Sequence, residues 1–188
     1  MKLIINTNYP KLYEEAAKTK VLEVLFKYPE KEFSLSDLAE ESSVAKANIG
    51  NILEKFRESN LITIEKLSKI WRIKANQTNE LFIKSKIIYN LNFIYKSSLI
   101  EFLKDYYNNP KAIILFGSFR KGEDISNSDI DIAIEYDKIK EHKINELKID
   151  KIDKKMQIHL FNRESIDINL FNNIANGIVL WGFLEVKK

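Results

Sequence analysis

The stretch LFGSFRKGEDISNSDIDIAIEY, residues 115–136, decides the fold of the C-terminal part of the chain. It closes an apolar run with Gly117 and Ser118, passes through turn-forming residues, and enters the alternating sequence DIDIAIE at Asp129. Alternate side chains of a strand share a face, so Asp129 and Asp131 lie together while the isoleucines between them face the core. Two carboxylates about 7 Å apart repel each other and are costly to bury without a cation.

A cation and a phosphate would explain both the acid pair and the turn before it. Hard carboxylate oxygens favour Mg²⁺ or Mn²⁺. Gly117 lets the backbone approach a ligand closely, Ser118 offers a hydroxyl, and the amides that follow suit an anion at a helix start. The alternative is that Asp129 and Asp131 form the wet face of an edge strand. The turn and the acid pair together favour a nucleoside triphosphate pocket.

The spacing of Gly117-Ser118, ten residues, and then Asp129-Ile130-Asp131 resembles the signature of the minimal nucleotidyltransferases of the DNA polymerase beta superfamily. The resemblance implies that Asp129 and Asp131 bind the metals and that Ser118, with nearby amides, holds the β- and γ-phosphates. An acceptor hydroxyl would then attack the α-phosphorus, and pyrophosphate would leave. Gly117, Ser118, Arg120 and Lys121 form the expected nucleotide-binding set, although Arg120 and Lys121 could equally be ordinary loop charges.

The family's third carboxylate, expected on the next core strand, is missing from this chain. In the stretch KKMQIHLF the residues that face the pocket are Gln157 and His159. His159 is a candidate base or metal ligand, and a structural role is the alternative. Whether the domain catalyses nucleotide transfer is therefore an open question. The expected nucleotide is ATP, and one expected acceptor is a protein hydroxyl, as in family antitoxins that adenylylate a partner toxin.

The N-terminal part of the chain has a different pattern. Helical spacing runs over 13–27, a capping-box-like start at Ser34 opens a second helix, and a third runs from about 45 to 59. Two short strands, LITIEK and IWRIKA, follow around a turn at 67–69. This order resembles a winged helix-turn-helix domain, in which the third helix is the recognition helix.

Basic residues concentrate in that segment, with seven against three acidic ones between Ser43 and Lys74, although the whole chain carries only +3. The resemblance implies double-stranded DNA as a partner. The expected DNA contacts are Lys46, Asn48 and Asn51 on the recognition helix and Lys66, Lys69 and Arg72 on the wing. The alternative is a winged helix that serves dimerisation or protein docking.

The sequence thus predicts a two-domain chain of the α+β and α/β classes. Residues 1–75 form the winged helix-turn-helix domain, 76–110 a helical connector that could pair two copies, and 111–188 a nucleotidyltransferase-like domain with a mixed sheet flanked by helices. Within the last domain we expect a charged helix over 141–151 and a closing strand after Gly177.

Composition narrows the function classes. The chain of 188 residues has no cysteine, which excludes disulfides and cysteine-based metal sites or nucleophiles. It shows neither a signal peptide nor an apolar run of roughly 18 residues, so we expect a cytoplasmic protein without a membrane partner. Two functions stay open: a nucleotidyltransferase that also binds DNA, or a transcription regulator whose transferase-like domain is an inactive nucleotide sensor or interaction module.

Overall fold

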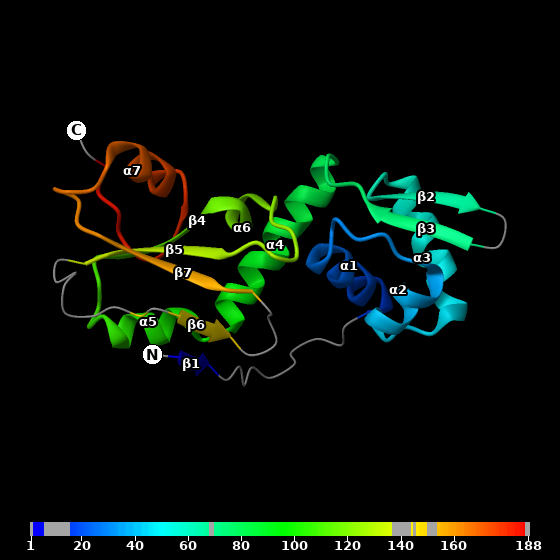
Figure 1. Ribbon diagram of the computed structural model, residues 1–188, viewed down its shortest axis with the longest axis horizontal. Helices are drawn as coiled ribbons and strands as arrows, with labels where there is room; N and C mark the ends of the chain where they lie inside the picture. The colour runs from blue at the N-terminus through cyan, green and yellow to red at the C-terminus, as the bar shows by residue number, and fades with distance from the viewer. Residues whose placement is uncertain are drawn as a thin grey trace. The chain divides into compact units, whose positions relative to one another are not determined.

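The computed structural model describes residues 2–5, 16–67, 70–136, 144, 146–149 and 154–186. The chain divides into two compact units (Figure 1). One contains the described residues from 16 to 89; the other contains strand β1 (Lys2–Ile5) and the described residues from Asn90 onward. The division falls within helix α4 (Glu80–Lys96). Among the described residues, no helix is long and apolar enough to cross a membrane.

The first unit has the winged helix-turn-helix order that the sequence predicts. Three helices precede an antiparallel hairpin: α1 (Ala17–Lys27), α2 (Leu35–Ser42), α3 (Lys46–Glu58), β2 (Ile62–Leu67) and β3 (Ile70–Ala75). The hairpin register places Glu65 opposite Arg72. Its core joins all of these elements through buried residues such as Leu25, Leu38 and Leu53. Ser68 and Lys69, in the expected turn, lie outside the described residues.

The start of α2 is fixed by the capping box expected at Ser34. The Asp37 amide donates to the Ser34 hydroxyl at 3.2 Å, and the Ser34 amide donates to the Asp37 carboxylate at 3.2 Å. Two amides that no helical carbonyl can reach are satisfied in this way. The helix ends at Ser43, which adopts a left-handed conformation and turns the chain toward α3.

The second unit is built on a six-stranded mixed sheet of order β1-β6-β7-β5-β4-β8. Its remaining elements are α5 (Leu99–Tyr106), β4 (Ala112–Phe116), α6 (Gly117–Lys121), β5 (Ile130–Glu135), β6 (Glu146–Ile149), β7 (Met156–Phe161), α7 (Ile168–Ala175) and β8 (Ile178–Gly182). Strand β5, which contains Asp131 and directly follows Asp129, lies inside the sheet, antiparallel to β4 and parallel to β7.

Both faces of this sheet are covered. On one face Ile132 and Ile134 pack with α5, and on the other Ala133 packs with Phe171 of α7, so that α5 and α7 lie on opposite sides (Figure 1). Ala133 and Glu135, which alternate with these isoleucines along the strand, are therefore buried. The Arg163 guanidinium donates a hydrogen bond to the buried Glu135 side chain at 2.8 Å.

Two local expectations fail in this unit. Part of the predicted helix over 141–151 is strand β6, because Glu146–Ile149 pairs with both β1 and β7. Strand β1 itself was not anticipated, since four residues carry too little pattern to separate a strand from a loop. The predicted helical connector consists of two helices, because Ser98 is left-handed and separates α4 from α5.

Candidate functional site

The Gly-Ser turn and the acid pair lie against each other at the end of β4. Phe116 pairs with Asp131 across the sheet, and Gly117 follows with a left-handed φ of 74°. A Cβ added at Gly117 would lie 2.3 Å from the nearer carboxylate oxygen of Asp131. Only glycine fits here, because both the backbone conformation and the contact exclude a side chain.

Strand β7 supplies a polar partner to each carboxylate. Gln157 pairs with Asp131 in the parallel register, and its side-chain amide donates to Asp129. His159 places Nε2 at 3.1 Å from Oδ1 of Asp131, while its ring meets Phe116 edge-on with centroids 5.1 Å apart. The position where the family resemblance implies a third acid is therefore occupied by residues that hold the first two in place.

Asp129 and Asp131 do not form the solvent-exposed face of an edge strand. Strand β5 is hydrogen-bonded on both sides, and the Asp131 side chain is only 24% exposed. A partly buried carboxylate pair at the start of an interior strand is unfavourable without a function or a compensating cation. This burial removes the alternative that the sequence left open for the strand.

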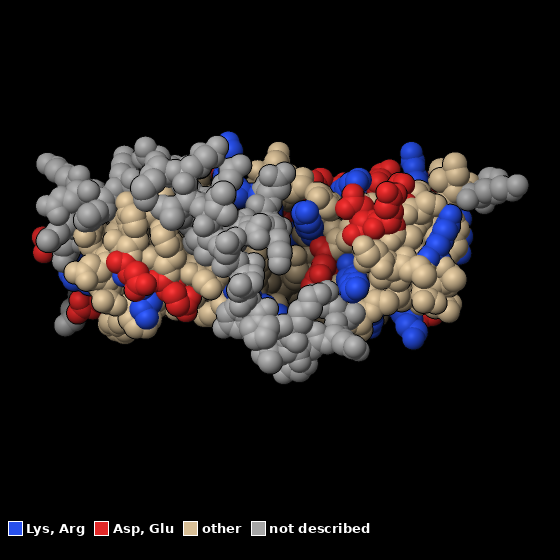
Figure 2. Space-filling model, turned by 90° about the horizontal axis from the view of Figure 1, so that it is seen from below, with Lys and Arg blue, Asp and Glu red and all other residues tan. Residues whose placement is uncertain are grey.

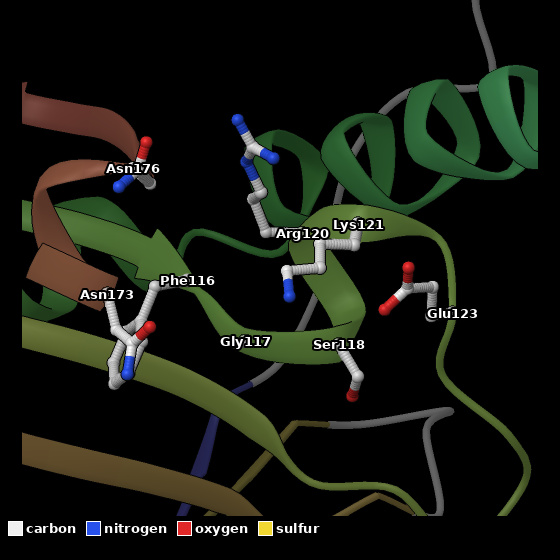
Figure 3. A pocket seen from close by; sticks show the side chains of 8 residues that line it. All are labelled: Phe116, Gly117, Ser118, Arg120, Lys121, Glu123, Asn173 and Asn176. Atoms are coloured by element: carbon white, nitrogen blue, oxygen red, sulfur yellow. The ribbon is translucent and has the colours of Figure 1, made fainter. Parts of the chain in front are cut away.

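Beside the turn lies a pocket of about 560 Å³ (Figure 3). It is lined by Phe116, Gly117, Ser118, Arg120, Lys121, Glu123, Asn173 and Asn176. Ser118 and Arg120 leave α6 in opposite directions, so a ligand that touches both must be extended (Figure 3). The Nε of Arg120 is buried and has no hydrogen-bond partner in the part of the chain that the structure describes, which suits an anionic ligand. Because α6 has only five residues, these side chains and amides, rather than a helix dipole, would supply the attraction.

A buried polar cluster fixes the loop between the turn and the acids. The Asn90 amide donates to the Phe119 carbonyl at 2.8 Å and to Asp124 at 2.9 Å. Lys154 forms an ion pair with Asp124 at 3.1 Å and also donates to the Ile125 carbonyl. Both charged side chains are almost fully buried, so the loop is held between α4 and the start of β7.

Sequence reasoning missed this cluster and part of the pocket. Asn90 and Lys154 lie far from the signature in sequence, and nothing in their local pattern marks them. Asn173 and Asn176, at the end of α7, line the pocket together with Arg120. The sequence signal for Asn173 and Asn176 is two polar residues at the end of an apolar helix, but such residues usually just face water.

The acid pair fits a divalent cation only if a ligand completes the coordination. The described residues contain no group of three His, Cys, Asp or Glu side chains arranged to hold a metal. Asp129 and Asp131 nevertheless offer two carboxylates beside a pocket suited to an anion. Mg²⁺ is commonly bound by one or two carboxylates together with substrate phosphates and water, so this pair fits it.

The residues expected to contact DNA separate into two groups. Lys46, Asn48 and Asn51 are exposed on α3, and Lys46 donates to the Ser36 hydroxyl at 2.6 Å. On the hairpin, Lys66 pairs with Glu54 at 3.2 Å, and Arg72 contacts Glu65 at 3.4 Å. Lys69 lies outside the described residues.

Acidic neighbours moderate the basic surplus of this unit. Glu32 lies 3.6 Å from Arg72 and 3.8 Å from Lys74. Figure 2 shows both basic and acidic side chains on the face in view. Exposed ion pairs of this kind are weak and can be exchanged for a phosphate.

The fold and the site define a two-domain protein, in which a winged helix-turn-helix unit accompanies a transferase-type sheet with a Gly-Ser turn and an acid pair. Residues 96–175 match the family model described as nucleotidyltransferase domain. This part of the chain is a nucleotidyltransferase domain, as the signature predicted. No curated protein matched the chain.

Solved structures similar to the chain include three regulators. Heme-free PefR is 14% identical, and the match covers 43% of this chain and 72% of PefR, with a TM-score of 0.35. A point mutant of Lactococcus lactis ZitR is 14% identical over 46% of this chain and 60% of ZitR, with a TM-score of 0.36. Bordetella bronchiseptica BpsR, whose DNA binding is regulated by 6-hydroxynicotinic acid, is 13% identical over 52% of this chain and 81% of BpsR, with a TM-score of 0.36. At these scores the winged-helix assignment rests on the chain's own elements.

Proposed function

We propose that the protein is a DNA-binding nucleotidyltransferase that binds a metal–nucleoside triphosphate, with ATP as the expected nucleotide, and transfers a nucleoside monophosphate to a hydroxyl acceptor. The observation that carries the proposal is the contact between the Asp131 carboxylate and the Gly117 backbone. It brings the acid pair and the phosphate-binding turn to one end of β4, beside a pocket that suits an anion.

The residues have separate tasks in this reaction. Ser118 would donate to a phosphate oxygen, and Arg120 and Lys121 would neutralise the triphosphate from the other side of the pocket. The acceptor oxygen forms a bond to the α-phosphorus, while the bond from that phosphorus to the bridging oxygen of pyrophosphate breaks. The acceptor's proton would pass to a base, for which His159 is the candidate nearest to Asp131.

Asp129 and Asp131 would hold Mg²⁺ or Mn²⁺, which when bound would neutralise the phosphates and lower the barrier to attack on the α-phosphorus. The protein's own contribution is to keep the two carboxylates together. Gln157 and His159 do so from β7, and the cluster around Asp124 holds the loop that leads into Asp129.

A second candidate follows from the same strand. Because Gln157 and His159 occupy the position of a third acid, the domain could bind the nucleotide without turnover and act as a sensor for the DNA-binding unit. A protein acceptor, a homodimer and a role in transcription regulation belong to either candidate. Nucleotide binding is common to both, so it is the first property to test.

The test is a calorimetric titration of the full-length protein with Mg²⁺–ATP. The double substitution Asp129→Asn with Asp131→Asn should abolish binding, because the amides cannot hold the cation. Asp105→Asn, an exposed aspartate on α5, is the matched control and should bind normally. Equal binding by the double variant would contradict the proposal. Transfer of labelled nucleotide to an acceptor in cell extract then separates the enzyme from the sensor.

A further inference from the structure

Gly50 is the glycine for which the fold gives no reason. The chain has five glycines, and three of them, Gly117, Gly122 and Gly182, adopt left-handed backbone conformations. At Gly177 a Cβ would lie 2.6 Å from atoms of β4. Gly50 lies inside α3 instead, where a Cβ would meet no atom within 4 Å.

Glycine at this position weakens the helix. A helix-interior glycine gives up more backbone freedom on folding than alanine does, and it offers no compensating contact. Its neighbours Ile49 and Leu53 are fully buried, so α3 is anchored without any contribution from Gly50. When a residue breaks a local rule with no internal benefit, a functional contact is the expected explanation.

The surroundings of Gly50 indicate what that contact is. Lys46 lies one turn before Gly50 on the same side of the helix, and Glu54 lies one turn after it, where it is paired with Arg57 and Lys66. Helix α3 and Lys66 together carry four basic and two acidic side chains, and this surplus of positive charge favours binding of a polyanion. Carboxamides bond adenine edges, and the major groove of B-DNA admits a single helix.

We infer that α3 enters the major groove of duplex DNA with Gly50 at the point of closest approach, where the DNA occupies the space that a side chain would fill. This inference rests on the proposed DNA binding and adds a steric requirement to it. Lys46, one turn earlier on the same side of α3, would contact a phosphate, and Asn51 on the adjacent side of the helix would reach the base edges.

The experiment compares the full-length protein with Gly50→Ala and Gly50→Lys. Asn92→Ala, at an exposed position of α4, is the control for a change that raises helix propensity elsewhere. The probe is a pool of random-sequence duplexes of about 30 base pairs, roughly three helical turns, from which the wild-type protein first selects its tightest binders. Affinity is measured by fluorescence anisotropy at two salt concentrations, and thermal unfolding is followed for each variant.

The substitution at Gly50 to alanine should raise the melting temperature and lower the affinity for DNA. Gly50→Ala should raise the melting temperature by about 2–4 °C, since the methyl group meets open space, and should weaken DNA binding about tenfold. Gly50→Lys should weaken binding further, although a purely electrostatic interaction would be strengthened by the added charge. Asn92→Ala should leave the affinity unchanged.

Other outcomes overturn the inference and are distinguishable. If the wild-type protein selects no duplex even at low salt, the proposed DNA binding itself fails. If it binds DNA and Gly50→Ala binds equally well, the DNA does not approach this position. If Gly50→Ala instead alters the oligomeric state in sedimentation, the surface docks a second copy of the chain and not DNA.

Discussion

A missing side chain, at Gly117, lets the Asp131 carboxylate lie against the backbone of the Gly-Ser turn. The same residue has a left-handed φ, so two independent constraints select glycine. The local sequence predicts Gly117, Ser118 and both aspartates as site residues because each one belongs to a short pattern with a physical meaning. Asn90 and Lys154 could not be found in this way, because their roles depend on contacts between distant segments.

Gly117→Ala should abolish Mg²⁺–ATP binding and destabilise the protein by at least about 1–2 kcal/mol, the cost of forcing an L-residue into the left-handed region. The clash with Asp131 adds to this cost. Gly122→Ala is the matched control, since Gly122 has a φ of 70° but leaves the contact at Asp131 unchanged. Calorimetry and urea unfolding of both variants measure the difference. Retained ATP binding by Gly117→Ala would contradict the close approach.

Tyr107 gives a residue-scale prediction on pH. Burial raises the pKa of this tyrosine to about 12, above the value near 10 that it has in the unfolded chain. Its contribution to stability is therefore complete below about pH 10 and is lost as the pH rises toward about 12. Tyr107→Phe should reduce the fall in unfolding free energy over this window, as measured by urea denaturation at about pH 9, 10 and 11. An identical pH profile in the variant would show that another group is responsible.

At the scale of elements, long amphipathic helices and alternating strands were predictable, whereas short elements in charged sequence were not. Helices α1 to α3 and strands β4, β5 and β7 each repeat an apolar spacing that matches one regular structure. Strand β6 has only four residues within a charged segment, and it is a strand because β1 and β7 lie beside it. Tertiary pairing here overrides local propensity.

The hairpin carries a prediction about DNA affinity. Glu32 contacts both Arg72 and Lys74, so Glu32→Gln should remove one of the two acidic contacts of Arg72 and the Glu32 contact of Lys74, and should tighten duplex binding several-fold at low salt. The gain should shrink as salt increases, because these charges are exposed. Glu41→Gln removes the same charge from a pair with Lys31 on another part of the unit and should have a smaller effect. Unchanged affinity in Glu32→Gln would argue against phosphate contacts by the hairpin.

The loop cluster carries a prediction about stability. Lys154→Met leaves the buried Asp124 carboxylate without its cation and should destabilise the protein by about 3 kcal/mol. Lys84→Met, which breaks an exposed pair with Glu80 at 2.8 Å, should leave stability unchanged. Chemical denaturation compares the two. Similar small effects in both variants would show that the Lys154 pair is not buried in solution.

At the scale of the whole molecule, the sequence predicted the two folded units but not which unit each segment of the chain joins. The division within α4 and the return of β1 to the second unit depend on contacts that no local pattern records. The winged-helix order and the nucleotidyltransferase signature were recognisable because each is confined to one continuous segment.

The two proposed activities should be separable by substitution. Asp129→Asn with Asp131→Asn should abolish nucleotide binding and leave duplex affinity in the absence of nucleotide unchanged, since neither residue belongs to the winged-helix unit. Lys46→Ala should weaken duplex binding and leave Mg²⁺–ATP titration unchanged. Loss of both activities in either variant, with folding intact by circular dichroism, would show that the modules do not act independently.

The pairing of β1 with β6 has a consequence for biosynthesis. Lys2–Ile5 leaves the ribosome long before its parallel partner, Glu146–Ile149, is translated. The winged-helix unit can therefore complete its core on the nascent chain while β1 still lacks a neighbour. The outermost strand of the mixed sheet must be added after most of the protein has emerged, which makes it a late event in maturation.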